Sequence, residues 1–226
     1  MDQLDRPPVS SQGQAVLRPD ADTVRNLSRK ASRREQEMDL KEFIKRCLDQ
    51  NYESMVRSVA GLTQKELGWR PSPQSMSIGF LVWHYARVLD RWVHTRALET
   101  LQLWEQGWAS RFDRLPPDPN DTGFAFTDEQ LEGFESPPAS ILLAYAEAAK
   151  VKAMEFLEGL DEYSLENVTV PNPRGGRITL ETMFQQLIWE FNQHGGQIAY
   201  LRGLQRGNEN PGYSGGVLEA AAEDAE

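Results

Sequence analysis

The chain has 226 residues, of which 39% are hydrophobic, and its formal net charge at pH 7 is -10. This length and apolar content suffice for a core, so we expect one compact unit with tails rather than a wholly disordered chain. The acidic balance argues against a general nucleic-acid-binding protein, because contact with phosphates requires a basic surface.

The N-terminal segment, residues 1–36, has the composition of a flexible arm. It contains Pro, Ser and Gln without a sustained apolar period, and its seven Lys/Arg against five Asp/Glu give it a slight positive charge. At the other end, residues 208–226 combine Gly, Pro and Ser with five acidic residues and no basic one. We therefore predict a disordered arm over 1–36, a folded domain over 37–207 and an acidic disordered tail over 208–226.

Helical periodicity dominates the predicted domain. The apolar stripes predict four long helices, over residues 38–62, 77–105, 139–160 and 180–204. Between them, Thr63 and Glu66 have the spacing of a capping box, and a short helix is predicted after Thr127. Two short β-prone runs around the turn at 171–176 predict a small hairpin. Four long helices with almost no strand predict an all-α four-helix bundle.

Glu190 and His194 are the polar residues that stand out on the last predicted helix. They lie four residues apart, beside the apolar stripe, so their side chains can converge on one point. A carboxylate and an imidazole facing an apolar core are costly unless they are paired, protonated or bound to a cation. On the second helix, His84 lies at the edge of the apolar face, whereas His94 falls nearly opposite its centre. We therefore expect the side chain of His84, but not that of His94, to point into the interior of the bundle.

Other readings of these residues remain open at this point. His84 alone is typical of a core histidine bonded to a backbone carbonyl, and Glu190 with His194 of a buried ion pair. Gln197 either orients a ligand of the site or has a plain packing role. Gly195 and Gly196 indicate a close helix approach or room for a site. The next polar positions on the second helix, Arg87 and Arg91, are expected on a solvated face.

The chain's single cysteine, Cys47, excludes an internal disulfide and every cysteine-built zinc site, and it lies on an apolar stripe as a small core residue. No run reaches the roughly 18 apolar residues of a membrane-spanning helix, and the N-terminus lacks a secretory signal. We expect a cytoplasmic protein that contacts neither membrane nor nucleic acid.

Four stretches of this sequence together resemble the DinB-like superfamily, in the branch of poorly characterised bacterial proteins. The resemblance covers residues 38 to 206 in order, and it is carried by Trp83-His84, residues 103–112, Asp121-Thr122-Gly123-Phe124 and residues 193–203. It implies a four-helix bundle of up-down-down-up type that holds a divalent metal at one end. The ligands implied by position are His84, Glu190 and His194, with Glu190 in place of the histidine that is common in the superfamily.

The resemblance also implies a range of chemistries. Zinc or nickel fits the superfamily, and the carboxylate makes iron or manganese more plausible. Better-understood relatives are metal-dependent S-transferases that act on a low-molecular-weight thiol and an electrophile, and family members often form homodimers. The alternatives are a metal-dependent hydrolase or isomerase, and a non-enzymatic stress-associated protein in which the metal or ion pair has a structural role.

Overall fold

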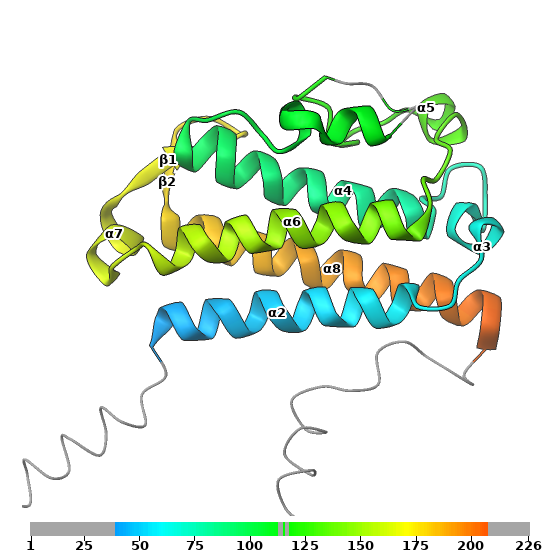
Figure 1. Cartoon of the computed structure of the whole chain (residues 1–226), viewed down its shortest axis with the longest axis horizontal. Coiled ribbons are helices and arrows are strands. Elements are labelled where there is room, and N and C mark those ends of the chain that lie inside the picture. The colour runs from blue at the N-terminus through cyan, green and yellow to red at the C-terminus, as the bar shows by residue number, and fades with distance from the viewer. Residues whose placement is uncertain (1–38, 113–114, 116–117, 208–226) are drawn as a thin grey trace, which may run out of the picture. The chain divides into compact units, whose positions relative to one another are not determined.

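The computed structural model describes residues 39–112, 115 and 118–207 (Figure 1). All of these residues belong to one compact unit that begins at Asp39. The predicted arm over 1–36 and the predicted tail over 208–226 lie outside the described residues.

The described residues form a mostly helical fold, as predicted. In chain order the elements are α2 (Leu40–Val59), α3 (Gln64–Gly68), α4 (Ile78–Asp90), η1 (Arg91–Leu98), η2 (Trp104–Trp108), η3 (Ala109–Arg111), α5 (Asp128–Glu132), α6 (Ala139–Glu158), α7 (Glu162–Asn167), β1 (Thr169–Pro171), β2 (Arg177–Thr179) and α8 (Leu180–Arg206). The predicted hairpin is confirmed: β1 pairs with β2 in antiparallel register, with Val170 opposite Ile178.

Polar side chains at the helix starts explain where most of these helices begin. The predicted capping box is present, with the Thr63 hydroxyl accepting from the Glu66 N–H and the Glu66 carboxylate accepting from the Thr63 N–H. Ser77 caps α4 and Thr179 caps α8 in the same way, each accepting from an N–H of the first turn. Such caps satisfy donors that the first turn leaves without a partner, so they set the boundaries of the helices.

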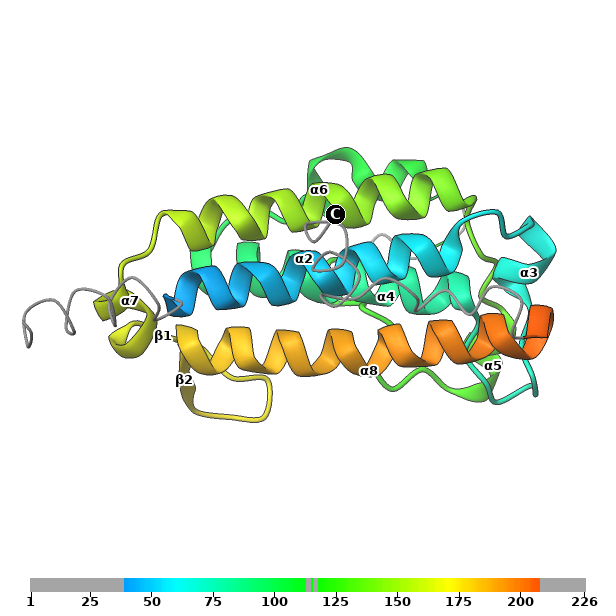
Figure 2. The same cartoon turned by 90° about the horizontal axis from the view of Figure 1, so that it is seen from below.

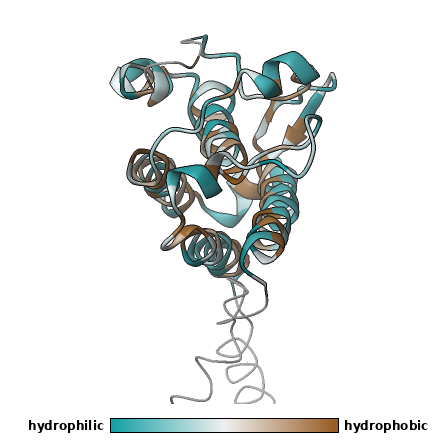
Figure 3. Ribbon diagram, turned by 90° about the vertical axis from the view of Figure 1, so that its right-hand side faces the viewer, coloured by the Kyte–Doolittle hydropathy of each residue, from teal (hydrophilic) through white to brown (hydrophobic). Residues whose placement is uncertain are grey.

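The long helices α2, α4, α6 and α8 pack as a closed ring. Helix α4 packs against α6 and α8, and α2 packs against the same two helices, so each helix has two neighbours (Figures 1 and 2). Seen end-on in Figure 3, the helices surround a shared interior. That interior is one core of buried apolar side chains, among them Leu48, Trp83, Leu142 and Leu187.

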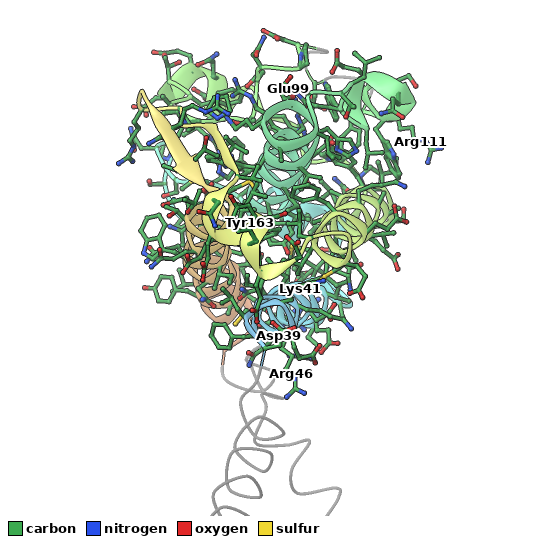
Figure 4. The ribbon with its side chains drawn as sticks, turned by 90° about the vertical axis from the view of Figure 1, so that its left-hand side faces the viewer. Asp39, Lys41, Arg46, Glu99, Arg111 and Tyr163 are labelled. Carbon is green, nitrogen blue, oxygen red and sulfur yellow. The ribbon has the colours of Figure 1, made fainter. Side chains whose placement is uncertain are left out.

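One end of the ring is closed by contacts between helix termini. Figure 4 shows this end, where Asp39 and Lys41 lie at the start of α2 and Tyr163 lies on α7. The Lys41 ammonium donates to the carbonyl of Glu158 at the end of α6, at 2.9 Å. Among the described residues, no helix has the length and apolarity that crossing a membrane requires.

The helix predicted over 77–105 changes its form at Asp90. The α-helix ends there, a π-helical segment continues to Leu98, and Glu99 takes a left-handed conformation with φ of 54°. The chain then turns back, and the described residues between 100 and 126 form a segment that covers part of α4. Gln102, Trp104, Pro119 and Asp121 of this segment hydrogen-bond to side chains of α4. As a result every residue of α4 is buried, including the polar ones.

This covering segment overturns one expectation. Arg87, expected on a solvated face, is completely buried, and Arg91 is half-buried against Asn120. His94, which was not expected to point into the bundle, is also buried at 6% exposure, and its Nδ1 lies 2.7 Å from a carboxylate oxygen of Asp90. Periodicity identified the face of the helix that the ring covers, but it could not show that a distant segment returns over the opposite face.

Candidate metal centre

The structure brings together the three residues that the sequence analysis singled out. His84 comes from α4, whereas Glu190 and His194 come from α8, one turn apart. One ligand atom from each of the three lies within 4.8 Å of the others. Because α4 packs directly on α8, a residue pair on one helix and a single residue on the other converge at one place.

The carboxylate of Glu190 lies between the two imidazoles. Its Oε1 is 3.3 Å from Nε2 of His84 and 4.0 Å from Nε2 of His194. The side chains are largely shielded from water, with exposed fractions of 8% for His84, 19% for Glu190 and 15% for His194. The two imidazole rings meet edge to face, with centroids 4.8 Å apart.

Each histidine is oriented by a hydrogen bond to its other ring nitrogen. Nδ1 of His84 lies 2.5 Å from the backbone carbonyl of Thr122. Nδ1 of His194 lies 2.8 Å from Oε1 of Gln197, the contact expected if Gln197 orients a ligand. A carbonyl oxygen only accepts, so Nδ1 of each ring carries the proton and Nε2 is left for a ligand.

The sequence analysis did not predict that the backbone carbonyl of Thr122 contacts His84. The carbonyl contacts His84 because the loop presses against α4 at Gly123, which has φ of +81°. A Cβ at Gly123 would lie only 2.7 Å from the ring of Phe80 and 2.8 Å from that of Trp83, so a side chain does not fit. The motif Asp121-Thr122-Gly123-Phe124 was available as a signal, but its contact with His84 depends on the path of the loop.

Burial lowers the pKa of His194 below its usual value. The nearby His84 lowers this pKa further, whereas the hydrogen bond to Gln197 and the charge of Glu190 raise it. The net direction favours the neutral imidazole, which is the form that ligates a metal ion.

The donor set fits a divalent metal ion. Two imidazole nitrogens and one carboxylate oxygen form a three-ligand set that leaves positions open, as in catalytic zinc sites and in non-haem iron(II) sites. In tetrahedral geometry with bonds of about 2.1 Å, ligand atoms are about 3.4 Å apart. The separation of 3.3 Å between His84 and Glu190 meets this value, whereas the 4.0 Å between His194 and Glu190 and the widest separation in the cluster, within 4.8 Å, would have to shorten by up to about 1.4 Å.

Two other expectations, for the glycine pair of α8 and for Cys47 of α2, have different outcomes. Gly195 and Gly196 do not mark a close helix approach, because a Cβ at either position would meet nothing within 4 Å. Both instead line a groove of about 300 Å³, together with Asn51 and Ser54 of α2. Cys47 is half-buried rather than a core residue, and burial raises the pKa of its thiol.

The family of the chain follows from a match that spans this whole site. Residues 48–198 match the DinB superfamily, and this range contains His84, Glu190 and His194. The chain belongs to the DinB superfamily. Among curated proteins, none matches this DinB-superfamily chain.

A solved structure shares the fold of this DinB-superfamily protein. It is the crystal structure of a conserved protein from Enterococcus faecalis, which is 24% identical and has a TM-score of 0.65. The similarity covers 74% of this chain and 98% of that one. At this level of identity the likeness supports the fold alone.

Proposed function

We propose that this protein binds one divalent metal ion through Nε2 of His84, a carboxylate oxygen of Glu190 and Nε2 of His194. The observation that carries the proposal is the convergence of these three atoms within 4.8 Å, on two helices and in largely buried surroundings. The hydrogen bonds that the two histidines make to oxygens of Thr122 and Gln197 support it, because both use Nδ1 and leave Nε2 facing Glu190. The proposal includes the up-down-down-up bundle of the family, which agrees with the ring of four helices.

The reaction that we propose is metal-dependent transfer of a low-molecular-weight thiol to an electrophile. A divalent ion held in an open site would lower the pKa of a thiol or a water molecule that joins it. The chain's own residues then hold and orient the site: the carboxylate of Glu190 reduces its net positive charge, and the bonds to Thr122 and Gln197 restrict rotation of the two imidazoles. Cys47 lies on α2 and is not among the three converging side chains, so the thiol in this scheme comes from outside the chain. We propose zinc or nickel as the first candidates for the bound ion, and iron or manganese as the next.

Elemental analysis of protein purified without a metal-affinity tag tests metal binding. We expect about one equivalent of metal in the wild type, and loss of that metal in His84→Ala and in Glu190→Ala. His94→Ala is the matched control, because His94 is the chain's remaining histidine and lies outside the cluster; it should keep the metal. A folded wild type that takes up no added zinc, nickel, iron or manganese would overturn the proposal.

The thiol reaction needs a separate assay. The metal-loaded wild type is mixed with a low-molecular-weight thiol and monochlorobimane, and the fluorescent conjugate is followed. We expect turnover that depends on both the thiol and the metal and that is absent in His194→Ala. Metal binding without thiol consumption would reject the transferase and keep the metal site.

A structural role is the second candidate, and one contact favours it. The 3.3 Å pair between His84 and Glu190 joins α4 to α8 directly. If fastening the two helices is the main role, Glu190→Gln should lower the free energy of unfolding of the metal-free protein, measured by urea denaturation. If the residues serve mainly to bind metal, the same substitution should leave the metal-free protein almost as stable as the wild type.

A further inference from the structure

Arg87 is a buried cation one turn beyond His84 on α4. Two of the carbonyls that accept its hydrogen bonds lie on the loop that contacts His84. The side chain has no exposed surface. Its guanidinium donates to the backbone carbonyl of Pro119 at 2.8 Å and to that of Asp121 at 3.1 Å. A fork of donors that grips two carbonyls of one short segment fixes both the position and the direction of that segment.

The remaining contacts of Arg87 hold the guanidinium itself in place. It donates to the side chain of Gln102 at 2.8 Å and to the Tyr145 hydroxyl at 3.1 Å, and it lies over the ring of Trp104 at 4.5 Å. Asp90 supplies the countercharge at 3.7 Å. Because these partners come from α4, α6 and the covering segment, the guanidinium is held on several sides.

The segment held by Arg87 leads directly to the carbonyl that orients His84. Asp121 accepts from Arg87 through its backbone oxygen, and the next carbonyl along the chain, that of Thr122, lies 2.5 Å from Nδ1 of His84. The side chain of Asp121 also accepts from the N–H of Gly123 at 2.9 Å, which braces the peptide groups on either side of Thr122. The Thr122 carbonyl is therefore braced at both of its neighbours.

We propose that Arg87 is a positioning residue for the metal centre: by holding the Pro119–Asp121 backbone, it places the Thr122 carbonyl so that His84 keeps its proton on Nδ1 and presents Nε2 toward Glu190. This inference rests on the proposed metal site for its functional meaning. Its structural part, the choice of tautomer by a held carbonyl, applies to the metal-free protein as well. Groups that accept the second N–H of a metal-ligating histidine typically change metal affinity by 10- to 100-fold when they are removed, and Arg87 acts on such a group, the Thr122 carbonyl, through the backbone.

Two measurements on Arg87→Met test the inference. The tautomer of His84 is read from the ¹⁵N shifts of its ring in the metal-free protein at pH 8. Zn²⁺ affinity is measured by competition with a chelating dye. We expect a single Nδ1–H tautomer in the wild type, a mixture of tautomers in Arg87→Met, and Zn²⁺ affinity weakened by about 10-fold or more.

Arg202→Met is the matched control for the loss of a buried arginine. Arg202 is 2% exposed and donates to the carbonyls of Ser58 and Ala60, neither of which belongs to the loop that contacts His84. We expect this variant to lose stability but to keep the His84 tautomer and the Zn²⁺ affinity of the wild type. A change in both quantities equal to that of Arg87→Met would show a general effect of destabilisation and would overturn the inference.

If Arg87→Met does not fold, a second pair of variants tests whether the position of the Thr122 carbonyl sets the His84 tautomer and the Zn²⁺ affinity. Asp121→Ala removes the acceptor that braces Gly123, whereas Asp121→Asn keeps an oxygen at that position. We expect weaker Zn²⁺ affinity and mixed tautomers in Asp121→Ala, with both restored in Asp121→Asn. An unchanged tautomer and affinity in Arg87→Met, or in Asp121→Ala where the first variant is unfolded, would overturn the inference. A wild type that binds no Zn²⁺ would instead reject the proposed function, and the tautomer would still report on the positioning.

Discussion

Asp90 lies at the centre of a buried polar cluster on α4, which it forms with Arg87, His94 and Tyr145. Replacing Asp90 by alanine removes the acceptor that this cluster shares. The carboxylate is completely buried and lies 3.7 Å from the equally buried Arg87. It accepts four short hydrogen bonds, from the Tyr145 hydroxyl at 2.6 Å, Nδ1 of His94 at 2.7 Å, the Trp104 N–H at 2.9 Å and the Leu103 N–H at 3.0 Å. The substitution therefore removes the acceptor that several buried donors share, and it removes the countercharge of the buried Arg87 guanidinium.

The expected loss follows from these contacts. Removing one partner of a buried ion pair costs about 3 to 5 kcal/mol, and a hydrogen bond to a charged group contributes about 1.5 to 3 kcal/mol. These contributions are not additive, because all four donors share one carboxylate and relax together. We expect Asp90→Ala to lower the free energy of unfolding by about 4 kcal/mol.

Urea denaturation followed by circular dichroism measures this loss. Asp49→Ala is the matched control, because Asp49 pairs with Lys150 at 2.8 Å, closer than the 3.7 Å between Asp90 and Arg87, but with 35% of its side chain exposed. Such a partly exposed pair contributes about 1 kcal/mol or less. If Asp90→Ala costs no more than Asp49→Ala, the buried cluster does not hold the covering segment on α4 as we argue.

The pH dependence of the difference in unfolding free energy between wild type and Asp90→Ala provides an independent check. Burial alone would raise the pKa of Asp90, but the hydrogen bonds from His94, Tyr145 and the two backbone N–H groups outweigh it, and the pKa is lowered. A carboxyl whose pKa is lower in the folded state stabilises the protein above its unfolded pKa of about 3.9. The difference between wild type and Asp90→Ala should therefore be complete at neutral pH and shrink as the pH falls below about 4.

Three further outcomes are expected. Gly123→Ala should destabilise the protein by about 2 to 3 kcal/mol in urea denaturation, because the new Cβ would overlap buried aromatic rings of α4; Gly176→Ala, with φ of +73° but open space around it, should cost only about 1 kcal/mol. The bond to Arg206 lowers the pKa of Glu66, so the stabilisation by this carboxylate should be present at neutral pH and lost in acid; a stability difference between wild type and Glu66→Gln that grows as the pH falls would contradict this. Zinc at about 100 times its Kd should raise the free energy of unfolding of the wild type by about 2.7 kcal/mol, with no such gain in His84→Ala.

The sequence predicted the helical content, and it singled out three side chains that the structure brings together, because both depend largely on local spacing. Glu190 and His194 are four residues apart on one helix, and that spacing alone places them one turn apart. The position of His84 at the edge of an apolar stripe indicated that it faces a neighbouring helix. The capping box at Thr63 was predictable for the same reason, since its two hydrogen bonds join residues three positions apart.

The polar cluster on α4 depends instead on contacts between residues far apart in the chain. Arg87 lies on the face that helical periodicity assigns to solvent, and it is buried because described residues between 100 and 126 return across that face and accept its hydrogen bonds. No local pattern encodes this return, since the hydrogen bonds that hold it join α4 to residues more than ten positions away.

The amino-acid sequence by itself determined the helices, their apolar faces and the three side chains that could share a metal ion, because these follow from a period of 3.6 residues. Only the tertiary structure decided that α4 lies against α8, so that the three ligand atoms meet, and that the Thr122 carbonyl orients His84. The physical reason is that helical spacing sets the direction of a side chain, whereas the partner it meets depends on how helices and loops pack.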